Sequence, residues 1–171
     1  MCPELPEHGA QPPLLYLAAP LFSSAERRFN VDVARRLEDT YRVFLPQRDG
    51  QLLMELVAEG LPPEMAAYRV FTADLAAIRE CSVLIAVLDG RSIDEGVAFE
   101  IGFAFSIGKL CVGLQTDVRR LLPVGNNPMI QCSLGAVVDG VDSLVVWLAN
   151  AVRLASSKRG QRRSAKVTDI I

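Results

Sequence analysis

The stretch Ser82-Val83-Leu84-Ile85-Ala86-Val87-Leu88 is the most strand-like segment of the 171-residue chain, and the turn-forming pair Asp89-Gly90 follows it directly. Its aliphatic residues are nearly continuous, whereas a strand with one face in water alternates apolar and polar residues. A continuous pattern is typical of a parallel strand that is covered on both faces. We therefore predict that residues 82–88 form the central strand of a sheet.

Shorter apolar runs on either side of this segment predict four further strands, at 14–19, 42–45, 110–115 and 136–138. A capping box, Ser23-x-x-Glu26, opens a helix before the second strand, and further helical patterns cover 51–59, 63 onward, 94–108 and 141–154. Strands that alternate with helices form parallel units with right-handed crossovers. The expected fold is α/β, a single doubly wound domain with a five-stranded parallel sheet, flavodoxin-like or Rossmann-like, with helices on both faces.

Two details complete the expected organisation. The polar residues 47–50 are expected to form a loop after the second strand. The helix that opens at Pro63 has an apolar stripe at helical spacing, which consists of Met65, Tyr68, Phe71, Leu75 and Ile78. We expect the domain to span 14–155, between a proline-rich leader at 1–13 and a basic, flexible tail at 156–171.

Composition restricts the partners of the chain. Hydrophobic residues make up 50% of it and charged residues 22%, yet no apolar run reaches the roughly 18 residues of a membrane helix. The first basic residue is Arg27, so the start lacks the pattern of a secretory signal, and we expect a cytoplasmic protein with no membrane partner. The net charge is −2 although the tail is basic, so the body is acidic and unsuited to nucleic acid.

Cofactor and metal chemistry are not indicated. The four cysteines lie far apart and the single histidine is His8, which disfavours a zinc site or a histidine-dependent triad. Cys81 and Cys111 adjoin apolar runs, where a thiol acts as a small hydrophobic group. Neither a dinucleotide-binding G-x-G-x-x-G after the first strand nor a phosphate-binding G-x-x-x-x-G-K-[ST] occurs. We expect no cofactor.

Polar residues gather where the predicted strands end, at 20–22, 47–49, 89–95 and 116–129, and ligands of doubly wound folds bind at this edge. In the helix at 94–108, Glu100 shares a face with Val97 and Ala104 near the positive helix end. A partly dry, ionised carboxylate there is a potential nucleophile. Spacing alone leaves open a buried carboxylate that is tied to a backbone amide or an arginine.

The neighbours of Glu100 have two interpretations each. Gly96 and Gly102 lie on either side of it, and glycine inside a helix suggests close approach, by a ligand at Gly96 and by the sheet at Gly102. Asp94 is a helix N-cap or a ligand contact, and Asp74 is a solvated helix edge or a site residue. Asp89, Arg91 and Glu95 are interpreted as loop charges.

An ordered set of motifs resembles the nucleoside 2-deoxyribosyltransferase family over roughly residues 14–150. Each motif falls at a predicted strand end or on the helix beside it: Tyr16-Leu17-Ala18-Ala19 then Leu21-Phe22, Ala73-Asp74-Leu75, Asp94-x5-Glu100-x-Gly102, and Asn127-Pro128-Met129. The resemblance implies base exchange between 2'-deoxynucleosides and free nucleobases, in nucleoside salvage, through a covalent deoxyribosyl intermediate on Glu100. It implies small-molecule partners and no cofactor.

The resemblance also implies the other site roles. Asp74 would be the general acid and base for the nucleobase, Asp94 would hold the sugar hydroxyls, and Tyr16 would orient the nucleophile. Phe22 would stack on the base and Gln47 would contact it. Asn127 and Met129 would reach into a neighbouring subunit's site, so the expected assembly is a homodimer or a larger homo-oligomer.

Two alternatives remain from the sequence. A sister group hydrolyses 2'-deoxynucleoside 5'-monophosphates with a matching glutamate. A carboxylate at Asp94 would repel a phosphate, but Ser23, Ser24, Arg27 and Arg28 lie near enough to bind one. The second alternative is a non-catalytic nucleotide-binding module on the same fold, since a fold does not fix a function.

Overall fold

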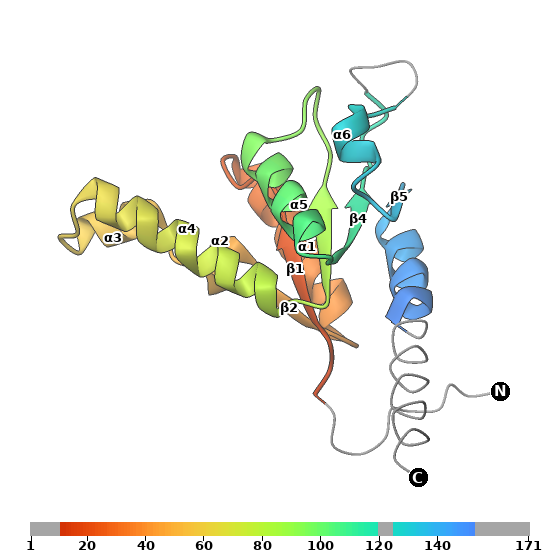
Figure 1. Cartoon of the computed structure of the whole chain (residues 1–171), viewed down its shortest axis with the longest axis horizontal. Helices are drawn as coiled ribbons and strands as arrows, with labels where there is room; N and C mark the ends of the chain where they lie inside the picture. The colour runs from red at the N-terminus through yellow and green to blue at the C-terminus, as the bar shows by residue number, and fades with distance from the viewer. Residues whose placement is uncertain (1–10, 120–124, 153–171) are drawn as a thin grey trace, which may run out of the picture.

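The computed structural model describes residues 11–119 and 125–152, and these form an α/β domain around one parallel sheet (Figure 1). The strands are β1 (Leu14–Ala18), β2 (Arg42–Phe44), β3 (Val83–Val87), β4 (Leu110–Leu114) and β5 (Ala136–Val138). Their order across the sheet is β2-β1-β3-β4-β5, and every neighbouring pair is parallel. All five predicted strands and the doubly wound class are confirmed.

The helices alternate with the strands. They are α1 (Ser24–Glu38), α2 (Pro46–Asp49), α3 (Leu53–Ala58), α4 (Pro63–Glu80), α5 (Glu95–Ser106) and α6 (Pro128–Gln131), and residues 141–152 are helical as well. The predicted capping box opens α1, since the Ser23 side chain accepts from the Glu26 amide and the Glu26 carboxylate accepts from the Ser23 amide. Of the predicted organisation, the leader and the tail lie outside the described residues, apart from 11–13.

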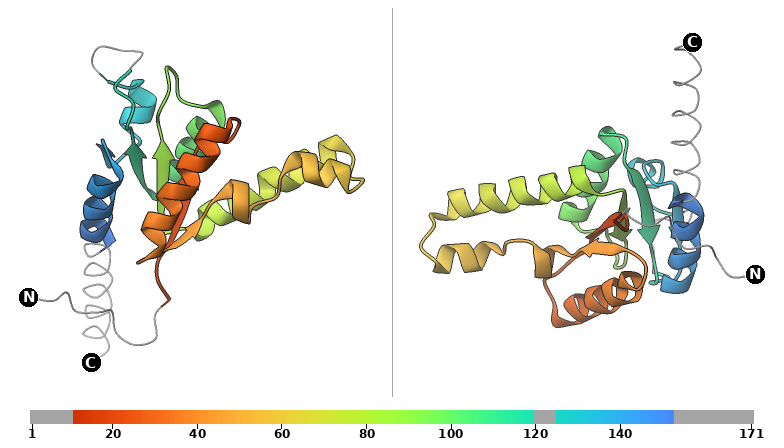
Figure 2. Two further views of the ribbon diagram at one scale, coloured as in Figure 1. Left: turned by 180° about the vertical axis from the view of Figure 1, so that it is seen from behind. Right: turned by 90° about the horizontal axis from the view of Figure 1, so that it is seen from below.

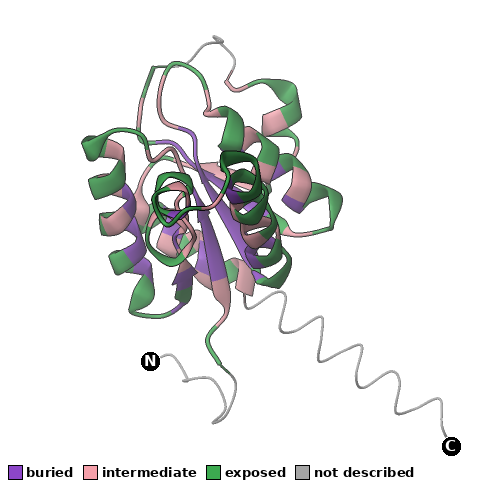
Figure 3. Cartoon of the chain, turned by 90° about the vertical axis from the view of Figure 1, so that its left-hand side faces the viewer, coloured by how far each residue is buried: buried purple, intermediate pink, exposed green. Residues whose placement is uncertain are grey.

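The core consists of two layers because successive strand residues face opposite sides of the sheet. Leu15 and Leu17 of β1 pack with α1 and the helix at 141–152, whereas Tyr16 and Ala18 pack with α4 and α5. All five residues of β3 are buried, as expected for the central strand, and Figure 3 shows this burial along the middle of the sheet. Cys81 and Cys111 are buried, and burial raises the pKa of both thiols to about 11.

The predicted apolar stripe on α4 is only partly a core face. Figures 1 and 2 show α3 and the first half of α4 extending together away from the sheet, as an arm that we define as residues 53–72. Ile78 is buried against the sheet, but Met65, Tyr68 and Phe71 are exposed on the arm, where no strand covers them. The helical periodicity predicted the stripe, and the structure divides it between the sheet and the arm.

The structure corrects the prediction for residues 47–50, which were expected to form a loop. Pro46–Asp49 form the short helix α2, with proline at its first turn. The Asp49 carboxylate accepts a hydrogen bond from the Leu45 amide at 2.9 Å, which closes the turn from within. Among the described residues, no helix is long and apolar enough to cross a membrane.

Candidate active site

Three elements bring Tyr16, Asp74 and Glu100 together on one face of the sheet. Tyr16 lies on β1 and is fully buried, and its hydroxyl donates a hydrogen bond of 2.5 Å to Glu100 Oε1 on α5. Its ring stacks on Phe44 of β2, with centroids 5.5 Å apart and planes 13° from parallel. The stacked ring leaves the hydroxyl little freedom, so the Glu100 carboxylate is held in one position.

Opposing influences set the ionisation of Glu100. Burial is the largest of them and raises its pKa to about 7, the Tyr16 hydrogen bond lowers it, and the charges of Asp74 and Asp94 raise it. Glu100 is therefore only partly ionised at neutral pH. A carboxylate with this pKa, half-buried and hydrogen-bonded through one oxygen, can act as a nucleophile or a proton carrier.

Asp74 is the second perturbed carboxylate. It lies on α4 where the helix returns to the sheet, and burial raises its pKa to about 6. Its charge also acts on Tyr16, whose pKa is raised above its usual range by burial and by the charges of Glu100 and Asp74. The tyrosine thus stays protonated and acts as a hydrogen-bond donor, while the Asp74 and Glu100 carboxyl groups both titrate near neutral pH.

Asp94 is the N-cap of α5, as its position indicated. Its Oδ1 accepts from the Val97 amide at 3.0 Å, and its charge contributes to the raised pKa of Glu100. A Cβ at Gly96 would lie 3.0 Å from this same oxygen, so a side chain there would press on the cap. The expected approach of the sheet at Gly102 is wrong, since that residue is exposed and an added Cβ would meet nothing within 4 Å.

The side-chain amide of Gln47 is held by one hydrogen bond at its oxygen and one at its nitrogen. Asn30 Nδ2 donates to Gln47 Oε1 and to the Pro20 carbonyl, both at 2.9 Å, and Gln47 Nε2 donates to the Arg27 carbonyl at 2.9 Å. These contacts join the loop after β1, the helix α1 and the short helix α2. Gln47 is therefore fixed at the carboxyl edge of the sheet, where ligands of this fold bind.

The loop after β1 has its polar groups engaged internally. Arg27 Nη1 donates to the carbonyls of Leu21 and Phe22, at 2.9 and 3.1 Å. Ser23 and Glu26 are occupied by the capping box. Phe22 itself is exposed, so the loop presents an aromatic ring outward and keeps the Arg27 guanidinium against its own backbone.

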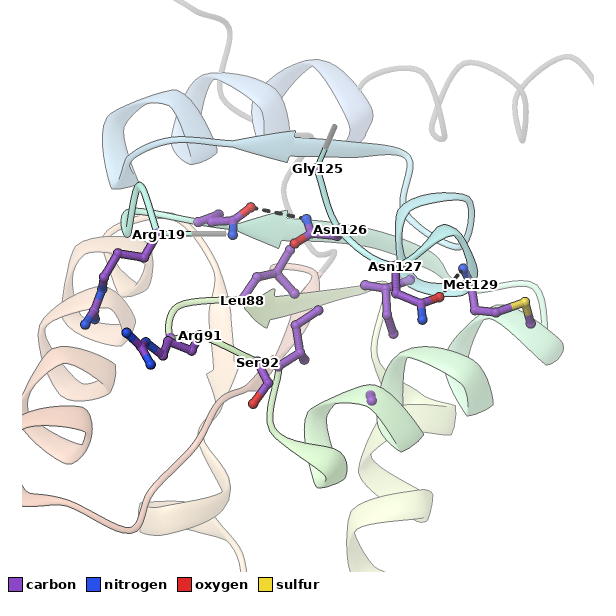
Figure 4. Close-up of a pocket in the computed structure, with 13 residues that line it drawn as sticks. Leu88, Arg91, Ser92, Arg119, Gly125, Asn126, Asn127 and Met129 are labelled. Carbon is purple, nitrogen blue, oxygen red and sulfur yellow. Dashed lines mark hydrogen bonds between the residues drawn. The ribbon is translucent and has the colours of Figure 1, made fainter. Parts of the chain in front are cut away.

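Asn127 and Met129 stand apart from the Glu100 cluster. They line a cavity of about 330 Å³ between the loop after β3 and α6, as Figure 4 shows, and none of Tyr16, Asp74, Asp94 and Glu100 lines it. Ala98 lines this cavity, and a residue two positions from Glu100 points to the far side of α5. Within one protomer the described structure therefore separates these two residues from the nucleophile candidate.

Sequence reasoning missed two residues that shape this edge. Asp89, interpreted above as a loop charge, accepts from the Thr116 amide, the Asp117 amide and the Thr116 hydroxyl at 2.6, 2.8 and 2.5 Å, and so joins the ends of β3 and β4. Asn30 was missed as well. Its signal was present, because a polar residue occupies the face that Val33, Ala34 and Leu37 bury.

No group of three or more His, Cys, Asp or Glu side chains in the described parts of the chain is arranged to hold a metal ion. The chemistry that this arrangement allows rests on its carboxyl groups, with a tyrosine that fixes one of them. Such pairs with raised pKa values carry out nucleophilic and acid–base steps at glycosidic bonds.

Comparisons with known proteins agree with this fold. No curated protein matches the chain. A solved 2-deoxyribosyltransferase from Bacillus psychrosaccharolyticus is 24% identical, with a TM-score of 0.65 over 77% of this chain and 89% of that one. A conserved protein from Enterococcus faecalis is 27% identical (TM-score 0.59, 79% and 95% covered), and a CMP N-glycosidase from Clostridium botulinum is 18% identical (0.51, 80% and 98%).

The family model described as nucleoside 2-deoxyribosyltransferase matches residues 15–158. The match begins in β1, which carries Tyr16, and includes Asp74, Asp94 and Glu100. It covers most of the chain, and the fold that the sequence predicted is the one the solved relatives share. The chain belongs to the nucleoside 2-deoxyribosyltransferase family.

Proposed function

We propose that the protein is a nucleoside 2-deoxyribosyltransferase that exchanges the nucleobase of 2'-deoxynucleosides. The observation that carries the proposal is the contact between Tyr16 and Glu100 beside Asp74, in a chain that matches this family. The geometry supplies an oriented carboxylate and, near it, a second carboxyl group with a raised pKa. Both are what a double displacement at an anomeric carbon requires.

In the proposed first step, a Glu100 carboxylate oxygen forms a bond to C1' of the sugar while the bond from C1' to the base nitrogen breaks. The departing base takes a proton from the Asp74 carboxyl group. A second nucleobase then attacks C1', the bond to Glu100 breaks, and Asp74 takes the proton that the incoming nitrogen loses. Tyr16 holds Glu100 in place throughout, and Asp94 contacts the sugar hydroxyls.

The loop after β1 favours free nucleosides over 5'-monophosphates. Of the groups that could bind a phosphate there, Arg27 and Ser23 are engaged with the protein itself, and the Glu26 carboxylate lies at the same helix end. Asp94 adds negative charge at the start of α5. A phosphate would meet the carboxylates of Glu26 and Asp94 at the starts of α1 and α5, and only Ser24 and the exposed Arg28 remain of the groups named above for binding it. The two carboxylates support a neutral 5'-hydroxyl as the natural substituent.

A homo-oligomer is part of the proposal. Asn127 and Met129 lie away from Glu100 in their own protomer, and Met129 is exposed, so they are available to cover the sugar in a neighbouring site. The arm and α5 supply a surface for a second copy, since Tyr68, Phe71, Phe99 and Phe105 are all exposed. Large exposed apolar groups of this kind mark interaction sites.

One chromatographic assay tests the reaction. Purified protein is incubated with 2'-deoxyinosine or thymidine, with and without adenine, beside the corresponding 5'-monophosphates. Deoxyadenosine that forms only when adenine is present supports base exchange. Free base released at the same rate without an acceptor, above all from monophosphates, identifies an N-glycosidase that uses water in place of the second base. Binding without turnover identifies a nucleotide-binding module.

Substitution of the nucleophile tests the assignment of Glu100. Glu100→Gln keeps the size of the side chain and removes the attacking oxygen anion, so turnover should fall by at least about 10³-fold. The matched control is Glu95→Gln, an exposed glutamate on the same helix, which should keep wild-type activity. Normal turnover in Glu100→Gln with an intact fold by circular dichroism would refute the mechanism.

A further inference from the structure

We propose that Asn30 is a positioning residue that fixes the side-chain amide of Gln47 toward the nucleobase. The inference rests on the proposed function, because it concerns how that site reads its substrate. It starts from Asn30 itself, which is 1% exposed on the buried face of α1. Among the buried residues of this helix it is the polar one, beside Val33, Ala34 and Leu37.

Stability alone does not account for an asparagine at this position. Its Nδ2 group donates two hydrogen bonds, but Oδ1 is buried and has no hydrogen-bond partner within the described part of the chain. A buried acceptor without a partner offsets much of what the donated bonds contribute. A leucine of similar size would fill the same space without an unpaired atom of its own, but the Pro20 carbonyl and Gln47 Oε1 would lose their donor. The role of Asn30 therefore lies in what it holds.

Two backbone carbonyls fix the orientation of the side-chain amides of Asn30 and Gln47. The Pro20 carbonyl only accepts, so the nitrogen of Asn30 must face it, and the Arg27 carbonyl imposes the same condition on Gln47. The Asn30 nitrogen then meets the Gln47 oxygen, as observed. The orientation of both amides therefore follows from the network and is consistent throughout.

Gln47 keeps one N–H and one lone pair beyond these contacts. It is partly exposed just after β2, next to the loop that carries Phe22. With its amide fixed, it presents a donor and an acceptor in a set order to the edge of a nucleobase, while Phe22 offers its face. Without Asn30 the Gln47 oxygen loses its donor, and the amide can turn and lose that order.

The test separates positioning from stability. Asn30→Leu should raise KM for the deoxynucleoside about tenfold while kcat changes less than about twofold. Because Asn30 acts through Gln47, the double variant Asn30→Leu/Gln47→Ala should have the KM of Gln47→Ala alone. Val33→Ala, on the same buried face, is the matched control and should lower the melting temperature while leaving KM unchanged.

A second measurement reads the contact without turnover. The Gln47 side-chain proton that is bonded to the Arg27 carbonyl, followed by nuclear magnetic resonance, should exchange with water slowly in the wild type and more quickly in Asn30→Leu, where the amide can turn. Turnover in the wild type with an unchanged KM in Asn30→Leu, or independent effects in the double variant, would overturn the positioning role alone. Absence of turnover in the wild type would overturn the proposed function and, with it, the ligand-facing role of Gln47.

Discussion

Several neighbouring residues together set the pKa of Glu100, and each of these residues can be substituted separately. Burial raises the pKa to about 7, and the nearby negative charges push in the same direction. The Tyr16 hydroxyl is the group that opposes them. The tyrosine therefore acts on the fraction of enzyme with an ionised nucleophile as well as on its orientation.

For Tyr16→Phe we predict a pH profile displaced toward alkaline values. Loss of the hydrogen bond raises the Glu100 pKa further above about 7, so less carboxylate exists at neutral pH and kcat/KM at pH 7 should fall about tenfold. The maximum of the profile should move to higher pH and be lower than in the wild type, because fewer molecules combine an ionised Glu100 with a protonated Asp74. A maximum at the wild-type pH or lower would contradict this account.

In the wild type, kcat/KM should be bell-shaped, with its maximum between about 6 and about 7. Glu100 must be ionised and Asp74 protonated for the first step, and these are the two pKa values concerned. In Asp74→Asn the falling limb should disappear, since it reports the acid. A single rising limb should remain, set by the ionisation of Glu100 alone. A pH titration of both proteins measures the two limbs.

At this scale the sequence predicted where these residues lie in the fold but not their properties. The spacing of Asp94 and Glu100 on one helix could be read directly, and so could the position of Tyr16 on a strand. The pKa of Glu100 could not, because it depends on Tyr16 and Asp74, which belong to other elements. Ionisation at such a site is a property of tertiary packing.

Among the elements, helix α5 begins at an N-cap, Asp94, which is also a residue of the proposed site. Asp94→Ala removes the cap to the Val97 amide and should lower the free energy of unfolding by about 1 kcal/mol. Asp94→Ser retains a capping oxygen and should keep most of that stability. Chemical denaturation of both variants measures the difference.

Activity separates the two roles of Asp94. If it also holds the sugar, both variants should have a raised KM for deoxynucleosides, although only Asp94→Ala is less stable. Removal of the carboxylate in Asp94→Ser should raise the ratio of monophosphate to nucleoside use. An unchanged ratio would show that residue 94 does not exclude phosphate.

Element boundaries were predictable where one local rule determined them. The capping box fixed the start of α1, and continuous aliphatic residues fixed β3. The loop expected at 47–50 failed for lack of such a rule, because the α2 turn depends on the Asp49 side chain closing back on Leu45. The exposure of Met65 could not be predicted either, because it depends on how far α4 extends past the sheet. Helical periodicity indicates an apolar face, but it does not say what covers that face.

For the whole molecule, the apolar surface on the arm and α5 leads to a prediction about assembly. The wild type should be a dimer or larger by light scattering, and Phe105→Glu should shift it toward the monomer and lower its activity, because a charge is placed in the proposed contact. Val146→Glu is the control. Val146 is 63% exposed against 57% for Phe105, and it lies on the helix at 141–152, across the sheet from α5.

Two results would contradict this proposal. One is a wild-type protein that is monomeric and fully active. The other is a Phe105→Glu protein that dissociates without loss of activity, since Asn127 and Met129 could not then be needed by a neighbouring site. At this scale the geometry could not be predicted from the sequence, because the position of Met129 relative to Glu100 depends on how α6 packs against α5.

The position of β1 between β2 and β3 has a consequence for biosynthesis. β1 leaves the ribosome first, and β2 follows soon after it, but the residues of β3 emerge only after α4 has been made. Until then one edge of β1 carries backbone groups with no neighbouring strand, and such edges pair readily with other chains. Glu100 is translated later still, 84 residues after Tyr16, so the contact between the two residues forms late. A nascent chain of this protein is therefore most exposed to aggregation until β3 is complete, and the Tyr16–Glu100 contact forms only after α5 has been made.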